Sequence, residues 1–138
     1  MANREMAASP ESAQAPCPAR KVFDLIGPKW TMTILHTLQV GARPIRFRRL
    51  QQAVGSITPK ELTKRLRDLE RAGLLARTIY AEVPPRVEYS LTDLGRSLMP
   101  AMITIHDWAV EHGAAVEASQ LSYDLASAGA AAGPGHTV

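Results

Sequence analysis

The pattern of hydrophobic and polar positions predicts helices in the first half of the chain. Apolar residues recur three and four positions apart over residues 18–26, 29–39 and 47–54, which is the period of a helix with one buried face. Gly41 is expected to close the second of these helices, because glycine is the usual residue after a helix C-terminus. The second helix carries the clearest apolar stripe, formed by Trp30, Ile34, Leu35 and Leu38.

A fourth helix has the strongest local signal. Thr58, Pro59 and Glu61 form a capping box, with threonine at the N-cap, proline at the first helical position and glutamate reaching back from the third. Gly73 lies where the helix would stop. The apolar positions between them are Leu62, Leu66 and Leu69.

The segment after Gly73 changes to the period of a β-strand. Residues 74–82 and 87–91 alternate between two faces and flank a turn with two prolines, which predicts a hairpin. Thr92 then caps a long helix that reaches toward Gly113, and residues 117–126 add a short one. Two short helices joined by a turn and followed by a hairpin indicate an α+β fold, mainly α with a small β-hairpin wing: a winged helix-turn-helix with dimerisation helices at both ends.

The 138 residues suffice for one such domain. We expect residues 1–16 to be a flexible arm, 17–113 to be the winged helix-turn-helix domain, 114–126 to hold the short helix, and the low-complexity residues 127–138 to be disordered. No apolar run is long enough for a membrane span or a secretory signal, so the expected location is the cytoplasm, without a membrane partner.

The charge is concentrated in the middle of the chain. Residues 43–77 carry ten basic and three acidic side chains, a net charge of +7, whereas residues 78–138 carry a net charge of −5. A basic block flanked by a neutral head and an acidic tail indicates a surface for a polyanion such as double-stranded DNA.

The predicted DNA-binding face lies on the fourth helix, opposite its leucines. Its side chains are hydrogen-bond donors, which match the acceptors of phosphates and guanine edges. We expect Lys60, Thr63 and Lys64 to reach bases or nearby phosphates, and Arg67 and Arg71 to contact the backbone. The full set of predicted DNA-binding residues is Arg46, Arg48, Arg49, Thr58, Lys60, Thr63, Lys64, Arg67, Arg71 and Arg86.

Residues outside the fourth helix add to this set. The three arginines of the preceding segment lie on the helix that crosses the DNA backbone in this motif, and Arg86 lies where a wing tip would reach a minor groove. The carboxylates have a structural interpretation: Asp68 and Glu70 pair with Lys64 and Arg71, and Glu88 pairs with a nearby arginine.

Two other classes of function remain as alternatives. A winged helix can serve only protein contacts, and exposed lysines and arginines can be merely solvated. An enzyme is disfavoured, because no nucleophile lies beside a base and no glycine-rich phosphate loop occurs. A single cysteine, Cys17, and four scattered histidines give no metal site, and no cofactor is expected.

Several strings occur together in one order along residues 17–112: Cys17-Pro18, Asp24-Leu25-Ile26-Gly27-Pro28-Lys29-Trp30-Thr31, Ile57-Thr58-Pro59-Lys60-Glu61-Leu62, Arg65-Leu66-Arg67-Asp68-Leu69-Glu70, Pro84-Pro85-Arg86-Val87-Glu88-Tyr89-Ser90-Leu91 and Thr92-Asp93-Leu94-Gly95. Together they resemble the HxlR-type, MarR-like regulators, which usually have two glycines where this chain has Gly27-Pro28. The resemblance implies a bacterial or archaeal transcription factor that binds a pseudo-palindromic operator as a dimer. Family members repress or activate, often in answer to oxidants, reactive electrophiles or aldehydes, and in several of them a cysteine at the position of Cys17 is the sensor.

The long helix has more apolar surface than one core contact needs, which predicts a homodimer. A thicker monomeric core is the alternative. The predicted dimer-interface residues are Val22, Phe23, Met99, Ile103, Trp108 and Val110.

Cys17 begins a helix close to Arg20 and Lys21, where the helix dipole and the cations favour a reactive thiolate. It is therefore a candidate redox sensor for an oxidant or other small-molecule effector. The alternative is an inert, partly buried thiol.

Overall fold

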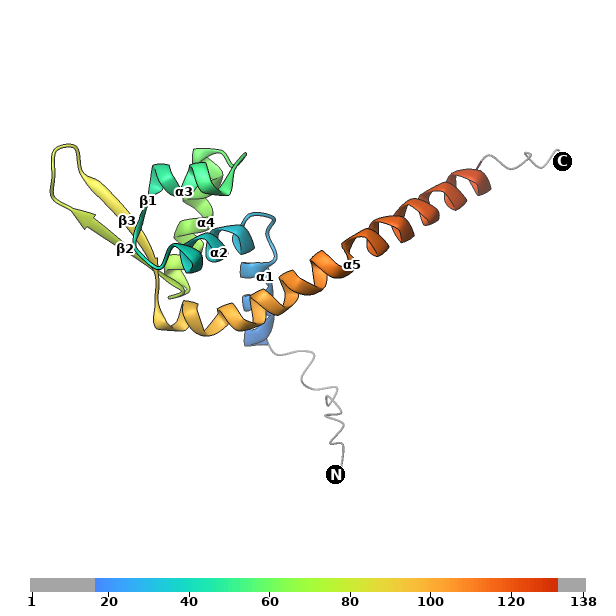
Figure 1. Ribbon diagram of the computed structural model, residues 1–138, viewed down its shortest axis with the longest axis horizontal. Coiled ribbons are helices and arrows are strands. Elements are labelled where there is room, and N and C mark those ends of the chain that lie inside the picture. The colour runs from blue at the N-terminus through green and yellow to red at the C-terminus, as the bar shows by residue number, and fades with distance from the viewer. Residues whose placement is uncertain (1–16, 132–138) are drawn as a thin grey trace, which may run out of the picture. The chain divides into compact units, whose positions relative to one another are not determined.

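The computed structural model describes residues 17–131, and its order of elements confirms the predicted winged helix-turn-helix (Figure 1). Residues 1–16 and 132–138, which include the predicted arm and most of the predicted tail, lie outside the described residues. The elements are α1 (Pro18–Ile26), α2 (Thr31–Gly41), β1 (Ile45–Arg46), α3 (Phe47–Val54), α4 (Pro59–Arg71), β2 (Leu75–Tyr80), β3 (Arg86–Leu91) and α5 (Asp93–Ala131).

The predicted hairpin is part of a three-stranded sheet. β3 lies between β1 and β2 and is antiparallel to both. The hairpin register pairs Tyr80 with Arg86 at the wing and Leu75 with Leu91 at the base. β1 adds only two residues, with Ile45 opposite Tyr89, so it ties the segment before α3 to the central strand.

The core of the domain is a cluster of aliphatic side chains from α2, α3, α4 and the base of the hairpin. The three leucines of α4 are at most 1% exposed, as their spacing predicts, and they fix which side of the helix faces outward. Other deeply buried apolar residues of this unit are Ile34, Leu35, Leu50, Leu75 and Met99.

The end of α2 differs from the prediction. Thr31 begins the helix after a turn in which its N–H donates to the carbonyl of Pro28, 3.1 Å away. At the other end Gly41 is helical, and the left-handed residue is Ala42, with φ 50°. Gly41 serves close packing instead, because a Cβ there would lie 2.8 Å from the Cδ1 of Ile45.

The chain divides into two units after Met99, and α5 contributes to both. The second unit contains the helical residues 100–131. The predicted break near Gly113 is wrong, and so is the separate short helix after it: α5 is continuous through this segment, and residues 127–131 of the predicted disordered tail are helical. Glycine in a helix costs only about 1 kcal/mol relative to alanine, and the surrounding alanines are the best helix formers.

Within residues 17–131, none of the helices combines the length and hydrophobicity that crossing a membrane would require. The same residues contain no group of three or more metal-binding side chains.

Candidate nucleic-acid interface

The start of α4 is fixed by half of the predicted capping box. The Thr58 hydroxyl oxygen accepts a hydrogen bond from the backbone N–H of Glu61, with 3.2 Å between the atoms. The carboxylate of Glu61 does not complete the box, because its Oε1 lies 3.1 Å from Nε of Arg65, one turn along the helix. A charged partner on the helix is a stronger attraction for a carboxylate than the neutral N–H of the N-cap residue.

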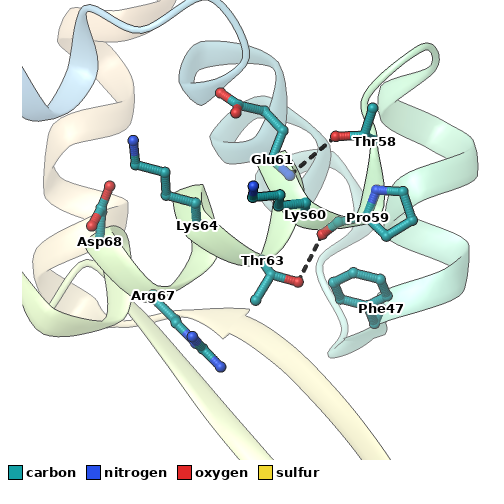
Figure 2. Close-up of a pocket in the computed structure, with 9 residues that line it drawn as sticks. All are labelled: Phe47, Thr58, Pro59, Lys60, Glu61, Thr63, Lys64, Arg67 and Asp68. Carbon is teal, nitrogen blue, oxygen red and sulfur yellow. Dashed lines mark hydrogen bonds between the residues drawn. The ribbon is translucent and has the colours of Figure 1, made fainter.

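Four cations of α4 extend outward from the face opposite the leucines. All four are exposed, and within residues 17–131 none of them forms an ion pair. They are Lys60, Lys64, Arg67 and Arg71. Figure 2 shows the side chains of Lys60, Lys64 and Arg67 extending away from the helix, Arg67 on the side of the hairpin strands. We call these four residues the α4 cationic face.

The carboxylates near α4 are held by other cations. Arg65 binds both Glu61 and Asp68, and the distance from its Nη1 to Asp68 Oδ2 is 3.8 Å. Glu70 lies 3.5 Å from Nε of Arg77 on β2. The predicted pairs of Asp68 with Lys64 and of Glu70 with Arg71 are therefore wrong. Asp68 pairs instead with Arg65, three positions back on α4, and Glu70 pairs with Arg77 on β2, which leaves the α4 cationic face without an ion pair within residues 17–131.

Thr63 and Phe47 complete the surface around this face. The Thr63 hydroxyl donates to the Pro59 carbonyl at 2.7 Å, so its methyl group and remaining lone pairs are what a ligand would meet. Phe47 lines a shallow hollow along the outside of α4 (Figure 2). Phe47 is half-buried, although its helical spacing puts it on the same face of α3 as the buried Leu50 and Val54, because spacing alone does not separate a rim position from a buried one.

The arginines before and within α3 are also free. Arg46, Arg48 and Arg49 are exposed, and the structure shows no carboxylate partner for them within residues 17–131. Their place in the DNA-binding set remains a prediction.

The wing presents a different environment. Arg86 lies between two carboxylates, 3.3 Å from Glu82 and 3.5 Å from Glu88, and its guanidinium carbon lies 4.1 Å from the centre of the Tyr80 ring. The predicted partner for Glu88 is thereby confirmed. The three charged groups sum to −1, so Arg86 is not a free cation in the way that the α4 residues are.

Tyr89 is a residue of the central strand β3 and is 8% exposed. Burial raises the pKa of its hydroxyl above the ordinary value of 10.0, Glu70 acts in the same direction, and the positive charges of Arg77 and Arg67 act against it. Its ring is 6.5 Å from that of Phe47, which joins the start of α3 to the central strand.

Cys17 is the exposed N-cap residue of α1, and its side chain makes no capping hydrogen bond. Among the predicted dimer residues of the first unit, Val22 and Phe23 are 43% and 66% exposed, whereas Met99 is 1% exposed and belongs to the core of its own chain. In the second unit Ile103, Trp108 and Val110 are 40%, 57% and 73% exposed.

Comparison with known proteins assigns this chain to a family. The model of the HxlR-like helix-turn-helix family matches residues 25–117. The chain is 41% identical over 96 residues to YdeP of Bacillus subtilis, an uncharacterized HTH-type transcriptional regulator. The matched region covers 70% of this chain and 73% of YdeP.

Solved structures agree with this assignment. The ytfH protein of Salmonella typhimurium is 33% identical, with a TM-score of 0.68 over 81% of this chain and 96% of that one. The redox regulator HypR in its reduced form is 34% identical, with a TM-score of 0.67 over 74% of this chain and 99% of that one. The family is non-enzymatic. The chain belongs to the HxlR-like helix-turn-helix family and is a transcriptional regulator of the HxlR/MarR type.

Proposed function

We propose that this protein binds a pseudo-palindromic operator in double-stranded DNA as a homodimer and responds to an oxidant or other small-molecule effector. The observation that carries the DNA-binding part is the α4 cationic face: four exposed cations, none of them paired with a carboxylate within residues 17–131. A major groove about 12 Å wide admits one helix and presents acceptors to such donors. Phosphates bound by these cations would release condensed counterions, which favours binding.

Different residues of α4 and α3 would contact different parts of the DNA. Lys60, Thr63 and Lys64 lie in the first two turns of α4, where a helix in the groove comes closest to base edges. Arg67 and Arg71 lie further along and would contact phosphates, as would the arginines around the start of α3.

The dimer is inferred from exposed apolar side chains in each of the two units. Val22 and Phe23 on α1, and Ile103, Trp108 and Val110 on α5, expose surface whose burial is worth about 25 cal/mol per Å². A second copy can cover this surface with two-fold symmetry. Two α4 helices related by that axis would enter successive major grooves, about 34 Å apart.

Binding-site selection on random DNA, followed by gel shifts over a salt series, tests the DNA-binding part. We expect affinity to fall steeply with salt, and the double substitution Lys60→Ala with Lys64→Ala to abolish selection of one sequence. Lys29→Ala, which removes an exposed cation outside the α4 cationic face, serves as the control. Salt-independent binding, or equal loss in the control, would contradict the proposal and favour a module for protein contacts.

Sedimentation of the purified chain tests the dimer. We expect Val110→Glu to shift the protein toward monomer, because a charge would have to be buried in the interface. Val40→Glu is the matched control: Val40 is 69% exposed on α2 and is not among the predicted interface residues. A monomeric wild type, or the same shift in both variants, would overturn this part.

Cys17 is the candidate for the oxidant response. As the chain has one cysteine, oxidation would join the Cys17 thiols of two copies, or Cys17 and a small thiol. Each disulfide releases two protons, and its two electrons pass to the oxidant. HypR has solved structures in oxidized and reduced forms, and YodB of B. subtilis in a reduced and a diamide-treated form. Diamide should release operator DNA from the wild type and not from Cys17→Ser. Equal release from both would exclude Cys17 as the sensor.

A further inference from the structure

A second hollow lies at the base of the hairpin, within the unit that precedes residue 100. Four segments line it: the end of α2, the loop before β1, the end of β3 and the first turn of α5. Its lining is Leu38, Gln39, Ala42, Arg43, Pro44, Ser90, Leu91 and Arg96. Two arginines, one serine and one glutamine therefore line it, and none of the lining residues is acidic.

The two arginines differ in how they are held. Arg96 is oriented by its own neighbours, since its Nη1 donates to the Leu91 carbonyl at 2.9 Å and its Nη2 contacts the Asp93 carboxylate. Arg43 is exposed and has no ion pair within residues 17–131. A guanidinium fork binds carboxylate and phosphate groups through paired hydrogen bonds, so one fixed and one free arginine suit a ligand of that chemistry.

The backbone of the same loop supports an anion. Ala42 is left-handed, with φ 50° and ψ 3°, and follows the helical residue Gly41. A right-handed residue followed by a left-handed one turns successive N–H groups toward a common point, which forms an anion-binding nest. The N–H groups of Ala42 and Arg43 donate to no backbone carbonyl in the described part of the chain. Ala42 is also the C-cap residue of α2, a place where helices commonly end in the left-handed conformation.

The hollow lies at the opposite end of β3 from the wing tip. Ser90 and Leu91 pair with Ala76 and Leu75 at the base of the hairpin, whereas the wing is at the other end of β3, where Arg86 pairs with Tyr80. Ser90 is four steps of about 3.3 Å along the strand from Arg86, a distance of about 13 Å.

We propose that this hollow binds a small anionic molecule, a carboxylate or a phosphate, through Arg43 and Arg96. The inference gives a site and a chemical class to the effector and in that respect rests on the proposed function. The ligand would bridge the loop before β1 and the first turn of α5, which carry the start of the wing sheet and the start of the long helix.

The test is a titration of the full-length, isotope-labelled protein with inorganic phosphate and, separately, with benzoate, at constant ionic strength maintained with chloride. We expect saturable NMR shifts of the backbone amides of Ala42, Arg43 and Ser90. Arg43→Gln should weaken binding about tenfold, as expected for loss of one charge-assisted contact, and Arg96→Lys should weaken it through loss of the fork. Lys29→Gln, which removes the same charge elsewhere on the surface, should bind as the wild type does.

The response to the two probes identifies the ligand chemistry: saturation by benzoate alone indicates a carboxylate, and saturation by phosphate alone a phosphate. Absent saturation, or equal binding by Arg43→Gln, would overturn the proposal. A gel shift of Arg43→Gln without added anion distinguishes binding of a small anion from a direct contact of Arg43 with DNA. Loss of operator affinity together with a smaller salt slope would show that the hollow contacts a DNA phosphate, and would contradict the proposal. The titration uses no DNA, so its result is independent of whether an operator is bound.

Discussion

The hydroxyl of Thr92 donates a hydrogen bond to the carbonyl of Gly73, with 2.5 Å between the two oxygens. The same oxygen accepts from the N–H of Gly95 at 3.1 Å, so Thr92 caps α5 while binding Gly73, the residue after the C-cap of α4. Gly73 is left-handed, with φ 77°, and lets the N–H of Leu74 reach back to the Leu69 carbonyl at 3.0 Å. The C-terminus of the proposed DNA-reading helix and the start of α5 are therefore joined directly.

Gly95→Ala should disrupt this junction. A Cβ at Gly95 would lie 2.0 Å from the Leu74 carbonyl oxygen, a backbone atom that cannot rotate away. We expect the free energy of unfolding in urea to fall by about 1–3 kcal/mol, the usual cost of an overpacked site. Gly113→Ala is the control, because no atom lies within 4 Å of a Cβ there and alanine favours the helix by about 1 kcal/mol. Equal destabilisation by both would contradict the close approach at Gly95.

Thr58→Ala removes the N-cap of α4. The lost hydrogen bond to the N–H of Glu61 should lower the free energy of unfolding by about 1 kcal/mol, within a range of about 0.5–2 kcal/mol. Thr104→Ala is matched to it, since that exposed hydroxyl bonds only the Pro100 carbonyl inside α5 and caps nothing. Its effect should stay below about 0.5 kcal/mol in the same urea titration.

Glu82→Gln should increase the affinity for DNA. It removes one of the two carboxylates that hold Arg86 and leaves the wing with no net negative charge. Exposed ion pairs are worth up to about 1 kcal/mol, so we expect a gain of about two- to fivefold at low salt, measured by fluorescence anisotropy. Glu117→Gln on α5 makes the same change in net charge and should have less effect. If the two variants bind alike, Arg86 does not act from the wing.

Lys64→Ala and Arg71→Ala should affect DNA binding in different ways. A base contact at Lys64 predicts a loss of about 1–3 kcal/mol in discrimination between operators. A phosphate contact at Arg71 predicts weaker binding to every sequence and a smaller salt slope. Affinities of both variants for the selected site and for a scrambled site, over a salt series, measure this difference. Identical profiles would show that the division of roles along α4 is wrong.

Tyr89 should make stability depend on pH in the alkaline range. Burial raises the pKa of Tyr89 in the folded protein above its ordinary value of 10.0, so on alkaline titration the unfolded chain loses the proton first. The free energy of unfolding should therefore fall as the pH rises from about 10 through the folded pKa. Tyr89→Phe should reduce this slope, whereas Tyr123→Phe, at a 73% exposed position, should leave it unchanged. If the pH dependence of the free energy of unfolding is unaltered in Tyr89→Phe, the buried hydroxyl is not its cause.

Local periodicity was sufficient for most elements of the fold. The apolar spacing predicted α1 and α3 at their observed bounds, and the leucine spacing of α4 predicted which face is buried. These features depend on residues a few positions apart. The continuity of α5 past Gly113 was missed because a single glycine has the same local signal whether it ends a helix or is tolerated within one.

The amino-acid sequence alone determined the winged helix-turn-helix order and the cationic composition of α4, because both follow from short-range spacing and side-chain chemistry. Only the tertiary structure decided which cations are free. Arg65 and Arg77 hold the nearby carboxylates, and Glu82 and Glu88 hold Arg86. The pair of Arg65 depends on side-chain direction along α4, and the pair of Arg77 with Glu70 depends on how β2 lies against α4. The tertiary structure also decides that Arg43 and Arg96 line one hollow at the base of the hairpin, because the two residues are 53 positions apart in the sequence.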